Sequence, residues 1–342
     1  MRKSEGAMGS RRATVAVVGS YGVGLTMRLP RVPVAGETIA GGEFSSGHGG
    51  KGSNQAVGAA RLGADVAFLT AIGADTMGDG ARALWKAEGV DASATVTIEE
   101  TATMVGMILV EPSGENRIVI ATGALDHLSA DHVTSFRGRL ADADIAVVSL
   151  EIPLETAVAA LRSAREAGTT TLLNPAPAQR LPDSAWDHID VLTPNRSEAA
   201  ILLGHDPDAQ ESAADLAEQL RAKGVRTVVI TLGADGALIH DAAGRRTVPA
   251  VAPRAVVDTT GAGDSFTAAL AVALAEGQPI DAATQFAARA GAHTVSIAEV
   301  IPALPHRDDL RTNQNHQAGT HSGVHGGAGR PRPGGPVRRH TE

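Results

Sequence analysis

The 342-residue chain has no cysteine and few aromatic residues, which make up 2% of the sequence. The absence of cysteine excludes disulfides, thiolate metal sites and cysteine nucleophiles. With so few rings the core has to be built from aliphatic side chains and alanine, and stacking platforms for single-stranded nucleic acid are not expected. No apolar run approaches the roughly 18 residues of a membrane span, and the basic start lacks the apolar region of a signal peptide. We therefore expect a cytoplasmic protein with no membrane partner.

Positive charge is also scarce, except at the two ends of the chain. The sequence has 30 Lys and Arg residues against 38 Asp and Glu residues, a formal net charge of −8. Residues 1–12 carry +3 and residues 311–342 carry +4, which leaves −15 on the body, residues 13–310. An acidic body argues against a nucleic-acid partner. Both ends are predicted to be disordered, because segments with so little apolar surface cannot offset the entropy cost of ordering.

Within residues 13–310, short apolar runs alternate with stretches of helical character. Continuous apolar strands separated by helices indicate an α/β fold with a mainly parallel central sheet and helices on both of its faces. The predicted strands are Thr14–Gly19, Asp65–Thr70, Asp144–Leu150, Thr169–Leu173, Val191–Thr193 and Val225–Leu232. The predicted helices are Asn54–Leu62, Asp79–Glu88, Leu154–Glu166, Glu211–Lys223, Ala262–Glu276 and Ile280–Ser296.

Two regions, residues 33–46 and residues 93–121, interrupt this alternation. Both consist of extended segments joined by turns such as Pro112–Gly114, and the pair Thr103–Val110 and Arg117–Ala121 is typical of a hairpin. We predict that these two regions form a small β-lid on a single α/β domain.

The strongest chemical motif is the segment from Asp258 to Phe266 (DTTGAGDSF), which leads into an alanine-rich helix. Gly261 and Gly263 allow backbone turns that other residues rarely adopt, and consecutive N–H groups at a helix start can then form an anion hole. Asp264 is placed to act as a base on a hydroxyl beside the bound anion, which suits phosphoryl transfer. The pattern equally suits an ordinary glycine-rich loop with Asp264 as a helix cap.

A second glycine-rich segment, Gly47–Asn54 (GHGGKGSN), lies at the start of another predicted helix. It does not match the phosphate-binding P-loop, because position 45 is Ser and Gly52 follows Lys51. Its glycines allow close approach of the backbone, and Lys51 and Asn54 offer hydrogen-bond donors to a polyhydroxylated ligand. The alternative is a flexible loop with a solvated lysine.

Two further segments lie at the ends of predicted strands. In Thr193–Glu198 (TPNRSE), Asn195 and Glu198 share a helix face. They can organise water around a magnesium–nucleotide complex, although a helix cap explains the same pair at least as well. In Thr231–Gly236 (TLGADG), the pattern on its own indicates only a turn.

Taken together, these motifs resemble those of the ribokinase (PfkB-type) family of carbohydrate kinases. The resemblance runs from about Thr14 to Leu310 and depends on the joint occurrence of several segments in a fixed order. These segments are Pro33–Thr38 (PVAGET), Gly49–Arg61 (GGKGSNQAVGAAR), Leu150–Pro153 (LEIP), Asn174–Ala178 (NPAPA), Thr193–Glu198, Thr231–Gly236 and Asp258–Phe266.

The resemblance implies a role for each motif. Asp264 is implied to be the base that activates the primary hydroxyl of the sugar, beside an anion hole formed by Gly261, Ala262 and Gly263. The implied sugar contacts are Gly50, Lys51, Gly52, Ser53, Asn54, Glu151 and Asp264. The implied ATP contacts are Asn195, Thr231, Leu232, Gly233, Ala234, Asp235, Gly236 and Gly263.

The resemblance also implies cofactors and an assembly. Glu198 would help to order Mg²⁺ through water, and a monovalent cation, K⁺, would bind near Asp258 and Thr260. Lids of this family close over the sugar and often mediate dimerisation, so a homodimer is expected.

The chain departs from the family pattern at several positions. The family normally has an Asn and an Asp just after its first strand, both of which bind sugar hydroxyls, and here these positions are Gly22 and Gly24. Each lost hydrogen bond to a charged group weakens recognition by about 1.5–3 kcal/mol. Glu299 lies where glycine is usual in the cation loop, and Leu125 replaces a usual Asn. The sequence leaves open whether the substrate lacks those hydroxyls, another group replaces the carboxylate, or ribose binds weakly, and whether the cation site is retained.

The leading interpretation is ATP-dependent phosphorylation of the 5-hydroxyl of D-ribose or a related pentose. A second interpretation is a kinase of the same family that acts on deoxyribose, a ketohexose or a nucleoside, which the glycines at positions 22 and 24 favour. A third is a non-catalytic pseudokinase that senses sugar, and the intact Asp264 with its glycine loop argues against it.

Overall fold

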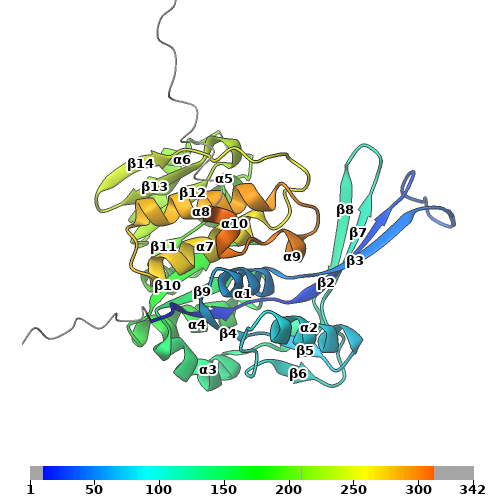
Figure 1. Ribbon diagram of the computed structural model, residues 1–342, viewed down its shortest axis with the longest axis horizontal. Coiled ribbons are helices and arrows are strands. Elements are labelled where there is room, and N and C mark those ends of the chain that lie inside the picture. The colour runs from blue at the N-terminus through cyan, green and yellow to red at the C-terminus, as the bar shows by residue number, and fades with distance from the viewer. Residues whose placement is uncertain (1–10, 209, 312–342) are drawn as a thin grey trace, which may run out of the picture.

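The structure, a computed structural model, describes residues 11–208 and 210–311 (Figure 1). In this part of the chain an eight-stranded sheet forms the centre of the molecule. Neighbouring strands are parallel from β4 through β1 to β12, and β13 and β14 extend one edge in antiparallel pairing, which confirms the predicted mainly parallel α/β fold. Across the sheet the strands are β14 (Gly244–Val248), β13 (Ala237–Asp241), β12 (Thr227–Thr231), β11 (Val191–Leu192), β10 (Thr170–Asn174), β9 (Ile145–Ser149), β1 (Thr14–Val18) and β4 (Asp65–Leu69).

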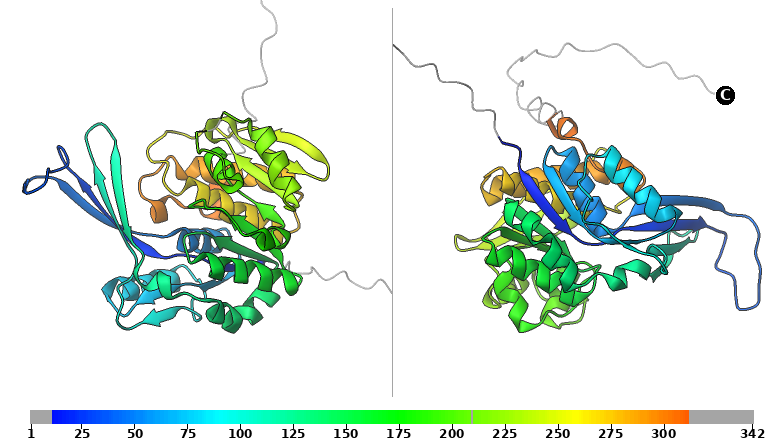
Figure 2. Two further views of the ribbon diagram at one scale, coloured as in Figure 1. Left: turned by 180° about the vertical axis from the view of Figure 1, so that it is seen from behind. Right: turned by 90° about the horizontal axis from the view of Figure 1, so that it is seen from below.

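Helices cover both faces of this sheet, because side chains alternate along each strand and both faces are apolar (Figures 1 and 2). In β1, Val15 and Val17 point into one core, and Ala16 and Val18 point into the other. The first core is closed by α1 (Lys51–Arg61), α2 (Thr76–Ala87), α7 (Ala262–Ala275) and α8 (Ile280–Thr294). The second is closed by α3 (Ala130–Asp142), α4 (Leu154–Glu166), α5 (Arg196–Leu203) and α6 (Ala213–Ala222). None of the helices in the described ranges is long and apolar enough to cross a membrane.

A second sheet, the lid, projects away from the body (Figures 1 and 2). Its strands lie in the order β3 (Glu43–Gly49), β2 (Gly22–Arg28), β7 (Val105–Val110) and β8 (Asn116–Ala121). The predicted hairpin is present as the antiparallel pair β7 and β8. Strand β2 was not predicted, because two glycines interrupt the apolar pattern that marks a strand.

The lid also differs from its predicted extent at two places. Residues 33–42 form no strand, and β3 begins only at Glu43. Residues 93–98 lie outside the lid, because β6 (Val96–Ile98) pairs with β5 (Ala71–Gly73) in a separate two-stranded sheet. The sequence of an extended segment does not reveal its pairing partner, and this is why both limits were misplaced.

Ion pairs anchor the start of the described chain to the body. Arg11 and Arg12 were predicted to belong to a disordered extension, but they pair with Asp144 and Asp65. Arg311 was predicted to begin the disordered C-terminal tail, but it is the last residue of a short helix. The predicted disorder of the remaining terminal residues falls on residues 1–10 and 312–342, outside the described residues. The chain from α8 onward contains α9 (Val300–Ala303) and α10 (Arg307–Arg311), and short 3₁₀ helices lie at Gly123–His127, Asp183–His188 and Gly233–Asp235.

Candidate active site

The candidate site lies at the carboxyl ends of the parallel strands. Ser20 follows β1, Glu151 follows β9, Asn174 ends β10, Asn195 follows β11 and Thr231 ends β12. The chain runs from β1 to its neighbour β4 on one side, whereas β9 lies on the other side of β1 and leads on to β10. Ligands of open parallel sheets bind at such a switch point, outside the carboxyl ends of the strands.

The first turn of α1 is packed tightly against the residues that follow β1. A β-carbon on Gly52 would lie 2.5 Å from the carbonyl carbon of Gly19, so only glycine fits at position 52 without a backbone shift. Glu151 joins the two segments, because its carboxylate accepts hydrogen bonds from the Ser20 hydroxyl (2.5 Å) and from the Lys51 N–H (3.0 Å). Glu151 therefore bridges the switch point and fixes the backbone of Lys51.

Asp264 lies in the first turn of α7 and is buried. Its two carboxylate oxygens accept hydrogen bonds from side-chain amides of consecutive residues on α1. Asn54 Nδ2 donates to Oδ2 (2.8 Å) and Gln55 Nε2 donates to Oδ1 (3.0 Å). The starts of α1 and α7 therefore meet at Asp264. Because a helix start carries positive partial charge, this meeting point favours a carboxylate and a phosphate.

Lys51 balances the negative charges around Asp264. Burial raises the pKa of Asp264 above its ordinary value, although the charge of Lys51 and the two amide donors act in the opposite direction. Burial on its own would lower the pKa of Lys51, but the charges of Asp264, Glu151 and Glu198 outweigh it and raise that pKa. Lys51 is therefore a cation at neutral pH, and the buried Asp264 has the perturbed pKa typical of a catalytic base.

The loop before α7 has the backbone expected of an anion hole. Gly261, which precedes the first residue of α7, has a left-handed φ of 80°, and a β-carbon there would lie 2.6 Å from a methyl carbon of Val300. A β-carbon on Gly263 would meet no atom within 4 Å, so the space beside it is open. The Ala262 N–H already donates to the Thr259 carbonyl (3.3 Å). Later first-turn N–H groups such as that of Gly263 have no acceptor within the helix and can serve an anion.

The residues predicted to bind nucleotide come together at the ends of β11 and β12. Asn195 and Thr231 form a bridge between the two segments, and the Leu232 N–H closes a turn onto the Gly236 carbonyl (2.8 Å). Asn195 and Glu198 form a capping box at the start of α5, with bonds of 2.8 Å to Asn195 Oδ1 and 2.7 Å to Glu198 Oε2. The helix cap that this pair also indicated is therefore present. Burial raises the pKa of Glu198.

One predicted sugar contact lies elsewhere, and two residues of the site were not predicted. Ser53 is fully buried, and its hydroxyl accepts a hydrogen bond from the Trp85 indole (2.9 Å), so its side chain points into the core. Gln55 and Asn174 had no assigned role, although both lie in the motif segments, and they bond to each other (3.1 Å) near Asp264. A linear motif does not say which side of a helix faces the ligand.

Comparison with known proteins decides the family. Residues 12–307 match the pfkB family of carbohydrate kinases. The chain belongs to this family. A ribokinase of Haemophilus influenzae is 37% identical over 298 residues, which cover 87% of this chain and 97% of that protein. A ribokinase of Schizosaccharomyces pombe is 39% identical over 302 residues, which cover 85% and 95%. The solved structure of an Arabidopsis thaliana ribokinase with ribose and ATP is similar at a TM-score of 0.81 and 28% identity, covering 88% and 98%.

Against the pattern of the pfkB family, the two glycines of β2 leave different amounts of space. A β-carbon at Gly22 would lie 2.4 Å from the terminal methyl carbon of Met104 and 3.0 Å from its carbonyl oxygen. A β-carbon at Gly24 would meet the Ile108 Cδ1 only at 3.5 Å. Met104 therefore fills the place of a side chain at position 22, whereas position 24 has room for one. At position 22 an apolar side chain therefore lies where the resemblance implies a polar one.

Glu299 has the strained backbone that explains why glycine is usual at this position. Its φ of 65° and ψ of 152° cost a non-glycine residue about 1–3 kcal/mol, and among the described residues only Glu299 combines a side chain with positive φ. We expect Glu299→Gly to raise the free energy of unfolding by about 1 kcal/mol, because the strain that is relieved exceeds the added chain entropy of glycine. Urea denaturation measures this difference.

The control for this prediction is Glu299→Ala, which removes the same carboxylate but keeps the β-carbon. It should give no comparable gain. If the alanine and glycine variants are equally stabilised, the backbone explanation is wrong and the charge of Glu299 is the cause.

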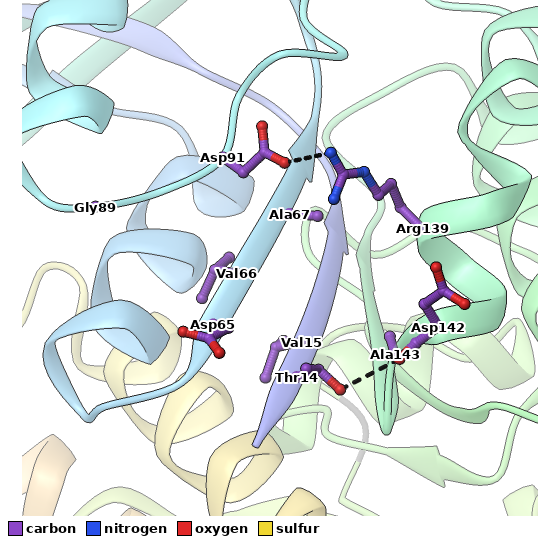
Figure 3. Close-up of a pocket in the computed structure, with 10 residues that line it drawn as sticks. All are labelled: Thr14, Val15, Asp65, Val66, Ala67, Gly89, Asp91, Arg139, Asp142 and Ala143. Atoms are coloured by element: carbon purple, nitrogen blue, oxygen red, sulfur yellow. Dashed lines mark hydrogen bonds and ion pairs between the residues drawn. The ribbon is translucent and has the colours of Figure 1, made fainter. Parts of the chain in front are cut away.

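A cavity of about 290 Å³ lies at the opposite edge of the sheet, by the amino ends of β1 and β4 (Figure 3). Polar groups in its lining bond to one another. Arg139 pairs with Asp91 (2.7 Å), and the Thr14 hydroxyl, which donates to the Asp144 carboxylate (2.7 Å), lies 3.4 Å from the Asp142 carbonyl oxygen. The cavity lies far from the carboxyl ends of the strands, where parallel sheets bind their ligands, and we assign no chemistry to it.

Proposed function

We propose that this protein is a ribokinase, which transfers the γ-phosphoryl group of ATP to the 5-hydroxyl of D-ribose or a related pentose. The observation that carries the proposal is the buried Asp264, held by two amides of α1 where the starts of α1 and α7 meet. The carboxylate takes the hydroxyl proton as the sugar oxygen bonds to the γ-phosphorus and ADP leaves. The N–H groups at the start of α7 hold the transferred phosphoryl group. The ribokinase relatives, one of them solved with ribose and ATP, support this substrate pair.

Mg²⁺ is proposed to bind with the nucleotide, where it would neutralise charge on the phosphates. Among the described residues no three His, Asp or Glu side chains form a metal-binding group. One carboxylate, such as that of Glu198, nevertheless suits Mg²⁺, which usually keeps several waters and binds mainly to phosphate oxygens.

K⁺ is proposed to bind near Asp258 and Thr260. The Thr260 N–H donates to the Asp258 carboxylate (2.9 Å), and the Asp258 N–H donates to the Val295 carbonyl (3.3 Å), so the two loops beside the anion hole are joined. The rate in potassium chloride, compared with that in tetramethylammonium chloride at equal ionic strength, tests this assignment.

A panel of acceptors tests the proposed activity. ADP release is measured with ATP, Mg²⁺ and, in turn, D-ribose, 2-deoxyribose, fructose and a nucleoside. The proposal requires the highest kcat/KM for D-ribose. A preference for 2-deoxyribose, fructose or the nucleoside would favour another kinase of the family, and sugar binding without any ADP release would favour the pseudokinase.

The missing side chain at position 24 predicts weak discrimination between ribose and 2-deoxyribose. A site that hydrogen-bonds a hydroxyl rejects the deoxy analogue because a buried polar group is left unpaired, and Gly24 leaves none. We expect Gly24→Asp to raise the ratio of kcat/KM for ribose to that for 2-deoxyribose by about tenfold or more, the scale of one charged hydrogen bond. The two steady-state rate constants measure this ratio.

Gly24→Leu is the matched control, because it fills the same space without a polar group and should leave the ratio unchanged. A ratio that does not move in Gly24→Asp would mean that water or another side chain already supplies the contact. Gly22→Asn is a poor test, because its side chain would collide with Met104.

A homodimer through the lid is also proposed. Strand register places Phe44, Met107 and Val119 on one face of the lid, opposite the face that carries Gly24, and all three are exposed. Exposed apolar patches of this kind mark interaction surfaces. Sedimentation should give the mass of a dimer for the natural protein and of a monomer for Met107→Glu. A cytoplasmic location remains a prediction.

A further inference from the structure

Gln55 is a buried amide that lies between the proposed base and the centre of the sheet. Its side chain is 1% exposed. Its Nε2 donates to Asp264 Oδ1 (3.0 Å) and to Asn174 Oδ1 (3.1 Å), and Asn174 Nδ2 donates in turn to the Thr193 carbonyl (3.2 Å). An unbroken line of hydrogen bonds therefore ties the carboxylate on α7 through α1 to the ends of β10 and β11.

The orientation of the Gln55 amide follows from its neighbours. Both atoms that face its Nε2 are acceptors, a carboxylate oxygen and an amide oxygen. If the amide were flipped, its Oε1 would face these two oxygens and no hydrogen bond could form. Asn174 is held in its own orientation because its nitrogen donates to a backbone carbonyl. The amide of Gln55 therefore has one orientation, and that orientation directs its N–H to Asp264.

The two amides of α1 leave their own oxygens unpaired. Gln55 Oε1 and Asn54 Oδ1 are buried without a hydrogen-bond partner in the structure. A buried acceptor without a partner destabilises a protein, and such groups in native structures call for a functional explanation. The nitrogens of both amides donate to the Asp264 carboxylate, while their oxygens have no partner. This indicates that the two amides serve to hold Asp264 in place, at the cost of unpaired acceptors of their own.

We propose that Gln55 is a positioning residue, which holds the carboxylate plane of Asp264 and favours its ionised form through the Asn174–Gln55–Asp264 line of hydrogen bonds. Gln55 is too deeply buried to bind the sugar itself. It acts on the reaction through Asp264 alone. This inference rests on the proposed kinase activity only for its kinetic readout.

Other charged groups also act on Asp264 and stay constant in the test. Lys51 on α1 favours the carboxylate, whereas Glu151 after β9 and Glu198 on α5 oppose it. Hydrogen-bond donation from Gln55 lowers the pKa of Asp264 against the effect of burial. Removal of that donation alone must therefore raise the pKa of Asp264.

The experiment compares the natural protein with Gln55→Met, which has a similar volume and no N–H donor. With the preferred sugar at saturation, we expect kcat to fall at least about tenfold at pH 7, and the acid limb of its pH profile to move up by about one pH unit. KM for ATP should change little. The pKa of Asp264 in the free enzyme, followed by carboxyl-carbon NMR without substrate, should rise as well.

Two further variants keep the test decisive. Asn174→Ala removes the support of Gln55 without touching Asp264, and should move the acid limb in the same direction by a smaller amount. Thr171→Val is the matched control: it removes a buried hydroxyl of β10 that bonds to the His188 carbonyl and Asp190, far from Asp264 in the bonding network. It should lower stability and leave the acid limb in place.

The proposal would be overturned if neither the acid limb of the kcat profile nor the NMR-measured pKa of Asp264 changed in Gln55→Met or Asn174→Ala. If Gln55→Met loses no more activity than Thr171→Val does, the role of Gln55 is purely structural. If the natural protein phosphorylates no sugar, the proposed function fails instead, and the NMR titration still decides the role of Gln55.

Discussion

Asp264→Asn should lower kcat by at least about 10²-fold, the usual scale for the loss of a general base. Asparagine has nearly the same shape, but its amide cannot accept the proton of the sugar hydroxyl. The affinity for ATP should change little, because the proposed base acts on the sugar hydroxyl and not on the nucleotide. Steady-state assays at saturating sugar and ATP measure kcat, and titration calorimetry measures the dissociation constant for ATP.

The same residue predicts how activity depends on pH. Burial raises the pKa of Asp264, so the ionised base is lost as the pH falls through a value above the ordinary carboxyl range. A folded-state pKa above the unfolded value also means that this carboxyl stabilises the fold at low pH and that this contribution is lost as the pH rises through the folded-state pKa. In Asp264→Asn this pH-dependent contribution is absent, but the new NH2 group faces the amide donor of either Asn54 or Gln55, which lowers stability. Urea denaturation at neutral pH shows whether the variant is folded under the assay conditions, so that the loss of kcat is separated from unfolding.

Asp144→Asn is the control for this variant. Asp144 accepts hydrogen bonds from Thr14 at the amino end of β1, so its replacement affects the fold at the edge of the sheet far from Asp264. Its kcat should stay close to that of the natural protein. Turnover of Asp264→Asn at the natural rate would exclude Asp264 as the base.

Gly52→Ala should damage both stability and activity through a single added methyl group. Its β-carbon would lie 2.5 Å and 2.7 Å from two backbone atoms of Gly19 and 2.7 Å from the Ser20 nitrogen, none of which can move without shifting β1 or α1. We expect a loss of about 1–3 kcal/mol in the free energy of unfolding. Because the same turn carries Lys51 and Gln55, a shift near 1 Å should also lower kcat/KM by about 10²-fold.

Gly138→Ala provides a matched control in another helix. A β-carbon on Gly138 would meet no atom within 4 Å, so the change should raise the free energy of unfolding by up to about 1 kcal/mol through helix propensity alone. For both variants, urea denaturation measures the free energy of unfolding and steady-state kinetics measure kcat/KM. A Gly52→Ala protein as stable and active as Gly138→Ala would mean that the contact with Gly19 is not needed.

Local sequence patterns determined the architecture and the chemistry of single residues. Apolar runs such as Val15–Val18, separated by helices, predicted the parallel sheet, because strands covered on both faces require apolar side chains at every position. The helix Leu154–Glu166 was predicted with its observed bounds. Asp264 and its glycine loop were recognisable because the proposed anion hole and the proposed base are formed by consecutive residues.

Contacts between distant residues were decided only by the tertiary structure. Gln55 and Asp264 lie 209 residues apart, and their hydrogen bond exists because α1 and α7 both start at the same edge of the sheet. The sequence likewise did not reveal that the Ser53 side chain points into the core, that β2 belongs to the lid, or that β6 pairs with β5. Local patterns report periodicity and backbone preference, whereas the choice of partner depends on the energy of packing the whole chain, which no local segment contains.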